Sequence, residues 1–131
     1  MVKWTAIPLK EINGVKFGMS RSEVRALFSG KYAEFKKSKF SQNTTDDFGI
    51  CHVFYNKDDK CEAVEVFNDC EVSVNGNLLF PLDISSVKQQ IDDLEEDSGS
   101  YISKKLSIGI YAPEGKPESI LFGEPGYYEE T

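Results

Sequence analysis

Residues 48–67 decide the fold, and they read Phe48-Gly49-Ile50-Cys51-His52-Val53-Phe54-Tyr55, then Asn56-Lys57-Asp58-Asp59-Lys60, then Cys61-Glu62-Ala63-Val64-Glu65-Val66-Phe67. The first and third segments are rich in β-branched and aromatic residues, and the middle segment is polar. Two such runs joined by a short polar segment are typical of antiparallel strands connected by a turn. The stretch therefore predicts a β-hairpin.

Further strand signals lie on both sides of this hairpin. Asn75-Gly76 separates the runs 71–74 and 77–80, and both of its residues tolerate the positive φ angles of a two-residue hairpin loop. Ile12-Asn13-Gly14-Val15 carries the same signal near the N-terminus. Additional strands are predicted at 105–111 and 118–122.

A first helix is predicted to begin at Ser20, which forms a capping box with Glu23. In this motif the serine hydroxyl accepts a hydrogen bond from the Glu23 amide, and the glutamate side chain reaches back to the Ser20 amide. Apolar residues follow at helical spacing, namely Val24, Leu27 and Phe28, and Gly30 supplies a left-handed stop. The lysine-rich residues 36–39 fit a second short helix and an exposed strand equally well.

Another helix is predicted after Pro81-Leu82, capped by Asp83 or Ser85. Its apolar residues recur at positions i, i+3, i+7 and i+10 and form one stripe, which consists of Ile84, Val87, Ile91 and Leu94. We expect this helix to end near Gly99. The apolar residues of both helices should face a sheet.

These elements predict one α+β domain that spans residues 1–131, with an antiparallel sheet of about five to seven strands and two helices on one face. The order of elements is that of a degenerate helix-hairpin repeat, because a capped helix followed by a strand, a polar turn and a strand occurs at 20–67 and again at 83–122. Ordinary recurrence of α+β elements gives the same order, so both explanations stay open.

Charge is unevenly distributed along the 131 residues, whose net charge is −7 at pH 7. Residues 1–40 hold nine Lys/Arg and three Asp/Glu, whereas residues 41–131 hold six and nineteen. Such a surface repels nucleic acid, whose binding depends on Lys/Arg contacts to phosphate, and it favours a basic protein partner. No apolar run approaches the ~20 residues of a membrane span, and the N-terminus lacks the apolar segment of a signal peptide. We therefore expect a cytoplasmic protein that does not bind membranes.

Three cysteines, Cys51, Cys61 and Cys70, make an odd count without C-x-x-C spacing. The pattern favours free thiols over a disulfide framework or a structural zinc site, with a Cys61–Cys70 bridge as the alternative for an exported chain. His52 follows Cys51 directly, and adjacent strand residues point to opposite faces, so these two side chains cannot form a catalytic dyad. We predict no catalytic residue, no metal ligand and no cofactor.

Acidic residues form two clusters that are candidates for binding a basic partner. The first cluster, placed at the C-terminal end of the second helix, comprises Asp92, Asp93, Glu95, Glu96 and Asp97. Carboxylates are unfavourable beside the negative end of the helix dipole, so helix stability does not explain this cluster. A solvated face and a docking surface both stay open as explanations.

The second cluster lies in and after the polar turn of the 48–67 hairpin and comprises Asp58, Asp59, Glu62 and Glu65. An edge strand guarded by charges is the alternative explanation for the two glutamates. Tyr127 and Tyr128, in the Gly- and Pro-rich tail, are candidate aromatic anchors for a partner. Packing of the tail onto the domain is the alternative for both tyrosines.

Two segments carry a family resemblance, namely Phe17-Gly18-Met19-Ser20-Arg21-Ser22-Glu23-Val24 and Tyr55-Asn56-Lys57-Asp58-Asp59-Lys60-Cys61-Glu62-Ala63-Val64. They resemble immunity proteins of bacterial contact-dependent growth inhibition and related toxin systems. The helix-then-strands unit is also similar to that of β-lactamase inhibitor proteins and outer-membrane assembly lipoproteins.

The immunity resemblance implies a small, acidic, non-catalytic cytoplasmic protein that neutralises the C-terminal toxin domain of a secreted effector. A nuclease fits best as the toxin, because nucleases present basic clefts that an acidic surface can occupy. The alternatives are a small carboxylate-based enzyme and a structural protein-interaction module.

Overall fold

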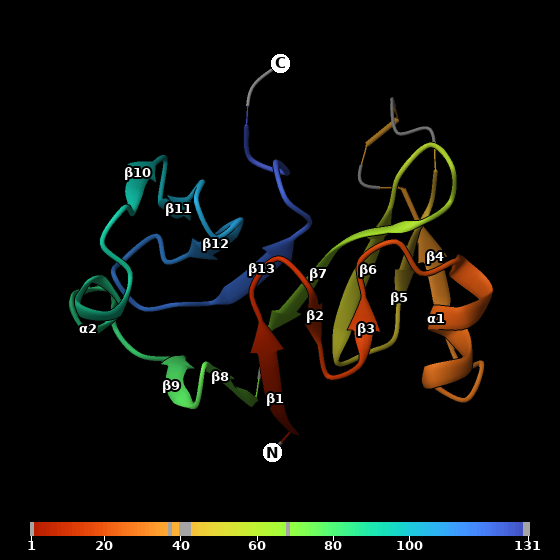
Figure 1. The fold of residues 1–131 in the computed structure, drawn as a ribbon, viewed down its shortest axis with the longest axis horizontal. Coiled ribbons are helices and arrows are strands. Elements are labelled where there is room, and N and C mark those ends of the chain that lie inside the picture. Colours follow the sequence, from red (N-terminus) through yellow and green to blue (C-terminus); the bar gives the residue numbers. More distant parts are fainter. Residues whose placement is uncertain (1, 37, 40–42, 68, 130–131) are drawn as a thin grey trace.

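The computed structural model describes residues 2–36, 38–39, 43–67 and 69–129, and within them the chain forms two helices and thirteen strands. The strands make one sheet of five strands and one of eight (Figure 1). The fold is thus of the α+β kind and is dominated by strands. The prediction of a single sheet with about five to seven strands is wrong, because the structure has two sheets and the larger one exceeds this number.

The five-stranded sheet has the order β3-β2-β1-β8-β9. Its strands are β1 (Val2–Ile7), β2 (Glu11–Ile12), β3 (Val15–Lys16), β8 (Cys70–Val74) and β9 (Asn77–Phe80). Both predicted tight turns are present, since Asn13 and Asn75 have φ angles of 48° and 52° and each precedes a glycine with positive φ. Short Asn-Gly turns therefore set the two hairpins of this sheet.

β1 pairs with β8 in parallel, with Val2 opposite Cys70. The expectation of a purely antiparallel fold is wrong at this pair. A helix and six strands separate β1 from β8 along the chain, so no tight turn fixes their relative direction. The alternation of buried Trp4 and Ala6 with exposed neighbours identifies β1 as a strand buried on one side.

The eight-stranded sheet is antiparallel throughout and has the order β10-β11-β12-β13-β7-β6-β5-β4. Its strands are β4 (Ala33–Phe35), β5 (Thr45–Asp47), β6 (Cys51–Tyr55), β7 (Cys61–Phe67), β10 (Glu95–Asp97), β11 (Ser100–Ser103), β12 (Ile108–Tyr111) and β13 (Ser119–Gly123). β6 and β7 form the hairpin predicted from residues 48–67. Of the lysine-rich residues 36–39, residue 37 lies outside the described residues and the other three belong to no helix or strand.

The two helices are each followed by a four-stranded meander. α1 (Arg21–Leu27) precedes β4 to β7, and α2 (Ile84–Gln90) precedes β10 to β13. The two meanders meet where β7 pairs with β13. From this pair outward, each meander runs from its last strand to its first, β7-β6-β5-β4 on one side and β13-β12-β11-β10 on the other. The helix-then-strands unit read from the sequence thus occurs twice in the described chain, with four strands in each unit.

α1 begins as predicted, because the Ser20 hydroxyl accepts from the Glu23 amide and the Glu23 carboxylate accepts from the Ser20 amide. α2 is capped by Asp83, but it ends earlier than predicted, and Ile91 has the extended angles φ −123° and ψ 115°. The acidic run that follows Ile91 would place several carboxylates at the negative end of the helix dipole, which disfavours further helix there. Neither of these described helices has the length and apolarity needed to cross a membrane.

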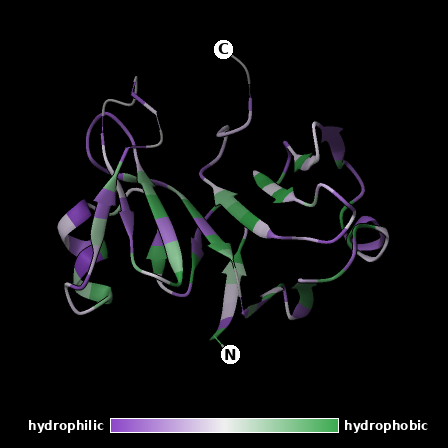
Figure 2. Ribbon diagram, turned by 180° about the vertical axis from the view of Figure 1, so that it is seen from behind, coloured by the Kyte–Doolittle hydropathy of each residue, from purple (hydrophilic) through white to green (hydrophobic). Residues whose placement is uncertain are grey.

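The core lies between the two sheets and the helices. Val53, Val64, Phe122 and Ile108 stand directly opposite one another on four central strands, and each is at most 1% exposed. The same core cluster contains Trp4, Ile12, Val72 and Phe80 of the five-stranded sheet, Val24 of α1, Ile84 and Val87 of α2, and Ile91 beyond it. Figure 2 shows apolar residues recurring along the central strands. Of the predicted helix residues, Leu27 is the exception, with 50% of its surface exposed.

A buried carboxylate joins α1 to the larger sheet. Asp46 stands opposite Val53 on the core face, and its side chain is 0% exposed. It accepts hydrogen bonds from Arg21 Nη1 at 3.1 Å, from Arg25 Nη2 and Nε at 2.8 and 2.9 Å, and from Tyr55 Oη at 2.8 Å. These hydrogen bonds to Asp46 raise the pKa of Arg25. Two arginines of one helix therefore share a carboxylate that belongs to the sheet, and each has a second carboxylate partner, Asp59 for Arg21 and Glu34 for Arg25.

Replacement of Asp46 by Asn should destabilise the fold by about 3 kcal/mol, because two largely buried guanidinium groups would lose their shared counter-charge. Urea unfolding at pH 7 measures the change. Asp92→Asn removes an exposed carboxylate and serves as the control, with an expected change within about 0.5 kcal/mol. Equal midpoints for the two variants would mean that α1 is held in place without the Asp46 carboxylate, by its apolar contacts and by the ion pairs of Arg21 with Asp59 and of Arg25 with Glu34.

Candidate functional site

The face of the eight-stranded sheet that points away from the core, here named the outer face, carries a row of residues that crosses all eight strands. Directly opposite residues of an antiparallel pair point to the same side of a sheet. In strand order the row consists of Glu95, Ile102, Gly109, Leu121, Glu65, His52, Asp47 and Ala33. Three carboxylates and the single histidine therefore share one line across the sheet.

Aromatic side chains lie beside this line. A second row of opposite residues runs through Asp97, Ser100, Tyr111, Ser119 and Phe67. The ring centroid of Phe67 is 4.6 Å from that of His52, and the ring centroid of Phe35 on β4 is 4.9 Å from it. Phe35 and Tyr111 are 38% and 43% exposed, so the outer face presents ring surface to solvent.

His52 lies between two carboxylates of the first row. Its Nδ1 is 3.7 Å from Glu65 Oε1, and its Nε2 is 3.7 Å from Asp47 Oδ1. The neighbouring Cys51 is buried on the core face, where burial raises the pKa of its thiol to about 12. The predicted separation of Cys51 and His52 is confirmed, and all three cysteines are buried free thiols.

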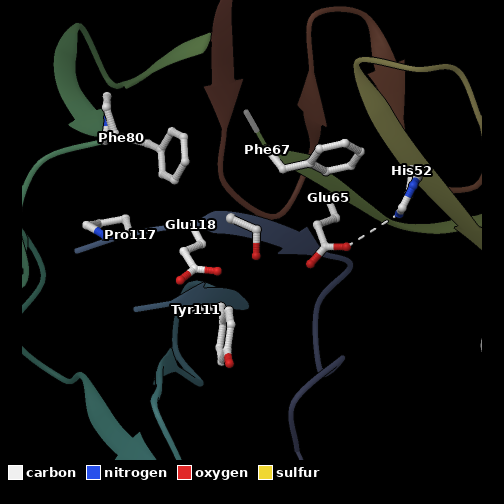
Figure 3. A pocket seen from close by; sticks show the side chains of 9 residues that line it. His52, Glu65, Phe67, Phe80, Tyr111, Pro117 and Glu118 are labelled. Carbon is white, nitrogen blue, oxygen red and sulfur yellow. Dashed lines mark ion pairs between the residues drawn. The ribbon is translucent and has the colours of Figure 1, made fainter. Parts of the chain in front are cut away.

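An open cavity of about 600 Å³ lies where the central β7–β13 pair ends. Its lining consists of His52, Glu65, Phe67, Phe80, Pro81, Tyr111, Pro117, Glu118 and Ser119. Figure 3 shows the carboxylates of Glu65 and Glu118 among the rings of Phe67, Phe80 and Tyr111. The cavity thus joins the outer face to the end of the five-stranded sheet, which supplies Phe80.

The tail covers another part of the outer face. Tyr127 packs on Gly123, where a Cβ would lie 2.6 Å from the tyrosine Cβ, and the Tyr128 hydroxyl occupies the space that a side chain would need at Gly109. Burial raises the pKa of Tyr127 to about 12 and raises that of Tyr128 as well. Both candidate anchors are therefore half-buried against their own domain, as the alternative explanation of the tail predicts.

Only the start of the acidic run 92–97 lies at the end of a helix, because α2 stops at Gln90 with Ile91 as its C-cap, and the run continues into β10. Asp93 is half-buried: burial opposes its ionisation, but hydrogen bonds from the Ser103 hydroxyl and the Lys105 amide lower its pKa. Glu95 and Asp97 belong to β10 and lie on the outer face, whereas Glu96 stands opposite Tyr101 on the other side. The strand pleat thus divides the cluster, and only part of it can meet a partner on the outer face.

The second acidic cluster is divided in a similar way. Asp59 binds the Arg21 guanidinium at 2.8 to 3.0 Å, and this bond lowers the pKa of the carboxyl group. Asp58 is exposed in the same turn. Glu62 lies near Glu124, whose pKa is raised by burial and by the Glu62 charge. Glu65 is the one member of this cluster that stands in the rows of the outer face.

Protein-family models, curated proteins and solved structures offer no match to this chain. Its function must therefore be argued from the site itself. Among the described residues, no group of three or more His, Cys, Asp and Glu side chains is placed to hold a metal ion. The arrangement offers carboxylates, a histidine and exposed rings on one surface, which are groups suited to binding a cationic partner and to acid–base chemistry.

Sequence reasoning missed several residues of this site, namely Phe35, Asp47, Phe67, Tyr111 and Glu118. The period of two along a strand already places Glu65 and Phe67 on one side of β7. The other residues come from strands that are distant in sequence, so their position beside Glu65 depends on the strand pairing. Only the registers of the eight-stranded sheet bring them together.

Substitution of Gly109 by Ala should displace Tyr128 from the outer face, because the added methyl group needs the space of the tyrosine hydroxyl. The phenol then returns to water, and its pKa should fall toward the ordinary value of about 10. An ultraviolet titration should show one more tyrosine ionising in the ordinary range than in the wild-type protein. Ser73→Ala, in the other sheet, is the control, and identical titrations of all three proteins would contradict the described packing of the tail.

Proposed function

We propose that this chain is an immunity protein that binds and neutralises a basic toxin domain through the outer face of its larger sheet. In this proposal the partner is the C-terminal toxin domain of a secreted effector, and a nuclease is its best candidate activity. The observation that carries the proposal is the row of carboxylates formed by Glu95, Glu65 and Asp47, which are drawn from three distant parts of the chain.

The charge of the outer face supports a basic partner. The two rows described above contain four carboxylates and no lysine or arginine. Charges of one sign on a surface steer an oppositely charged partner and raise its association rate. A cleft that binds nucleic acid must be rich in Lys and Arg, so a nuclease domain would present the complementary charge.

The exposed rings support a protein partner over a small ion. Phe35, Phe67 and Tyr111 lie beside the carboxylates, and aromatic residues are enriched where protein interfaces bury their centre. A surface of rings bordered by charges provides both affinity and orientation. The same features agree with the immunity resemblance of the 17–24 and 55–64 segments.

A cytoplasmic location belongs to the same proposal. The three buried free thiols suit a reducing compartment. An immunity protein protects its own cell when it is present in the compartment where the incoming toxin acts. A binding role needs no catalytic residue.

A small carboxylate-based enzyme is the second candidate, and the cavity is the observation in its favour. Glu65, His52 and Glu118 line one open space, and a histidine between carboxylates can transfer protons. Loss of turnover of any identified substrate in Glu65→Gln would favour this candidate. A purely structural interaction module is the third.

The test uses the toxin-domain reading frame adjacent to the gene, whose product should arrest growth alone and not when co-expressed with this chain. Association should slow by about tenfold to a thousandfold at low salt in the quadruple variant Asp47→Asn/Glu65→Gln/Glu95→Gln/Asp97→Asn. Stopped-flow measurements at two salt concentrations give the rates. The slowing should be smaller at the higher salt concentration, because salt screens steering.

A matched control changes the net charge equally at exposed or half-exposed positions outside the two rows, with Asp58→Asn/Glu71→Gln/Asp92→Asn/Glu114→Gln. Its association rate should stay within about threefold of the wild-type rate. Equal slowing in both variants would show that overall charge, and not the outer face, governs the encounter. Growth arrest that persists during co-expression would refute the immunity function itself.

A further inference from the structure

We infer that the cavity at the end of the β7–β13 pair receives an arginine side chain of the partner. The inference rests on the proposed function, since it names the group that the outer face would recognise. The cavity has a volume of about 600 Å³, and its lining includes Glu65, Glu118, Phe67, Phe80 and Tyr111. This volume lies within the range of about 300 to 1,000 Å³ that is typical of clefts and cavities that bind small ligands.

The two carboxylates of the cavity have spare capacity for a cation. Glu118 makes no ion pair within the described residues, and the ion-pair partner of Glu65 there is His52 at 3.7 Å, a distance beyond a good hydrogen bond. Each ionised carboxylate has about four lone-pair sites. Glu65 comes from a central strand and is only 27% exposed, which strengthens its attraction for an entering cation.

Ring surfaces provide the rest of the recognition. Tyr111 is 43% exposed and Phe67 is half-exposed, so both offer faces that no other side chain fully covers. In Figure 3 the rings of Phe67 and Tyr111 lie on different sides of the Glu65 and Glu118 carboxylates. A cation bound to the carboxylates would therefore also lie near aromatic rings, where it gains further attraction.

These walls suit a guanidinium better than an ammonium group or a metal ion. A guanidinium is planar, stacks on aromatic faces and donates two parallel hydrogen bonds to one carboxylate. An ammonium group is a compact and strongly hydrated charge that gains less from rings. Divalent cations prefer six or more oxygen ligands, whereas this cavity offers two carboxylates and mostly apolar walls.

The test is a titration of the full chain, followed by NMR of its backbone amides, with the blocked tripeptide acetyl-Gly-Arg-Gly-amide. The arginine peptide should shift the amides of Phe67, Tyr111, Glu118 and Ser119 and saturate in the millimolar range. The lysine peptide should bind at least about fivefold more weakly, and the citrulline peptide, which has the same shape without the charge, should cause no saturable shift.

Two variants and a control assign the effect to the cavity. Glu118→Gln and Glu65→Gln should each weaken the arginine peptide by about tenfold, because each removes a charged acceptor. Glu114→Gln removes an exposed carboxylate that does not line the cavity, and it should leave the affinity within about twofold. Amide spectra of all variants establish that they are folded.

Absence of saturable shifts at the cavity, or equal binding of the arginine and citrulline peptides, would overturn the inference. Equal binding of the arginine and lysine peptides would overturn the choice of a guanidinium. Either result leaves the immunity proposal standing if the toxin domain still binds with the expected dependence on the outer face. Conversely, saturable binding of the arginine peptide at the cavity with no neutralised toxin would keep the guanidinium site and refute the immunity function.

Discussion

The pairing of β7 with β13 is the contact on which the rest of the molecule depends. It joins the two helix-and-meander units into one sheet of eight strands, with Val64 opposite Phe122 on the core side and Glu65 opposite Leu121 on the outer side. Without this pair β7 and β13 would each be an unpaired edge strand of a four-stranded meander, and unpaired edges are prone to aggregation. The same pair also creates the proposed site, because the cavity lies at its end and the rows of the outer face cross it.

Local signals in the sequence predicted the elements that local physics determines. Asn13-Gly14 and Asn75-Gly76 formed the expected turns because few residue pairs accept positive φ twice in succession. The capping box fixed the start of α1 because its hydrogen bonds involve residues three positions apart. Strands β4 and β10 could not be predicted, since they are three exposed residues long and owe their extended form to a neighbouring strand. The parallel β1–β8 pair also joins strands that are distant in sequence, and no local sequence pattern predicts whether such strands pair in parallel or antiparallel.

The site was predicted only in part, for the same reason. Glu65, Glu95 and Asp97 were candidates on account of charge alone, and Asp93 and Asp59 were candidates on equal grounds. The structure separates them through geometry: Asp93 and Asp59 are engaged in intramolecular hydrogen bonds, whereas the others lie on an open surface. Phe67 and Tyr111 carry no individual signal of function, because most aromatic residues fill a core. Their place beside the carboxylates follows from the strand registers, which a single sequence does not reveal.

The glycine at position 109 has a consequence for how a partner can sit. Glu65 and Leu121 stand opposite each other on the central strands β7 and β13. His52 and Gly109 occupy corresponding places in the two units, since His52 pairs with Glu65 and Gly109 pairs with Leu121. In one unit the position carries an imidazole, and in the other it is bare backbone covered by Tyr128. If the two halves of the sheet were identical, a partner could bind in two equivalent orientations related by a half-turn. Because Tyr128 covers Gly109 whereas His52 is a side chain of the sheet itself, the two halves of the outer face differ at this position, and a half-turn does not superimpose one on the other.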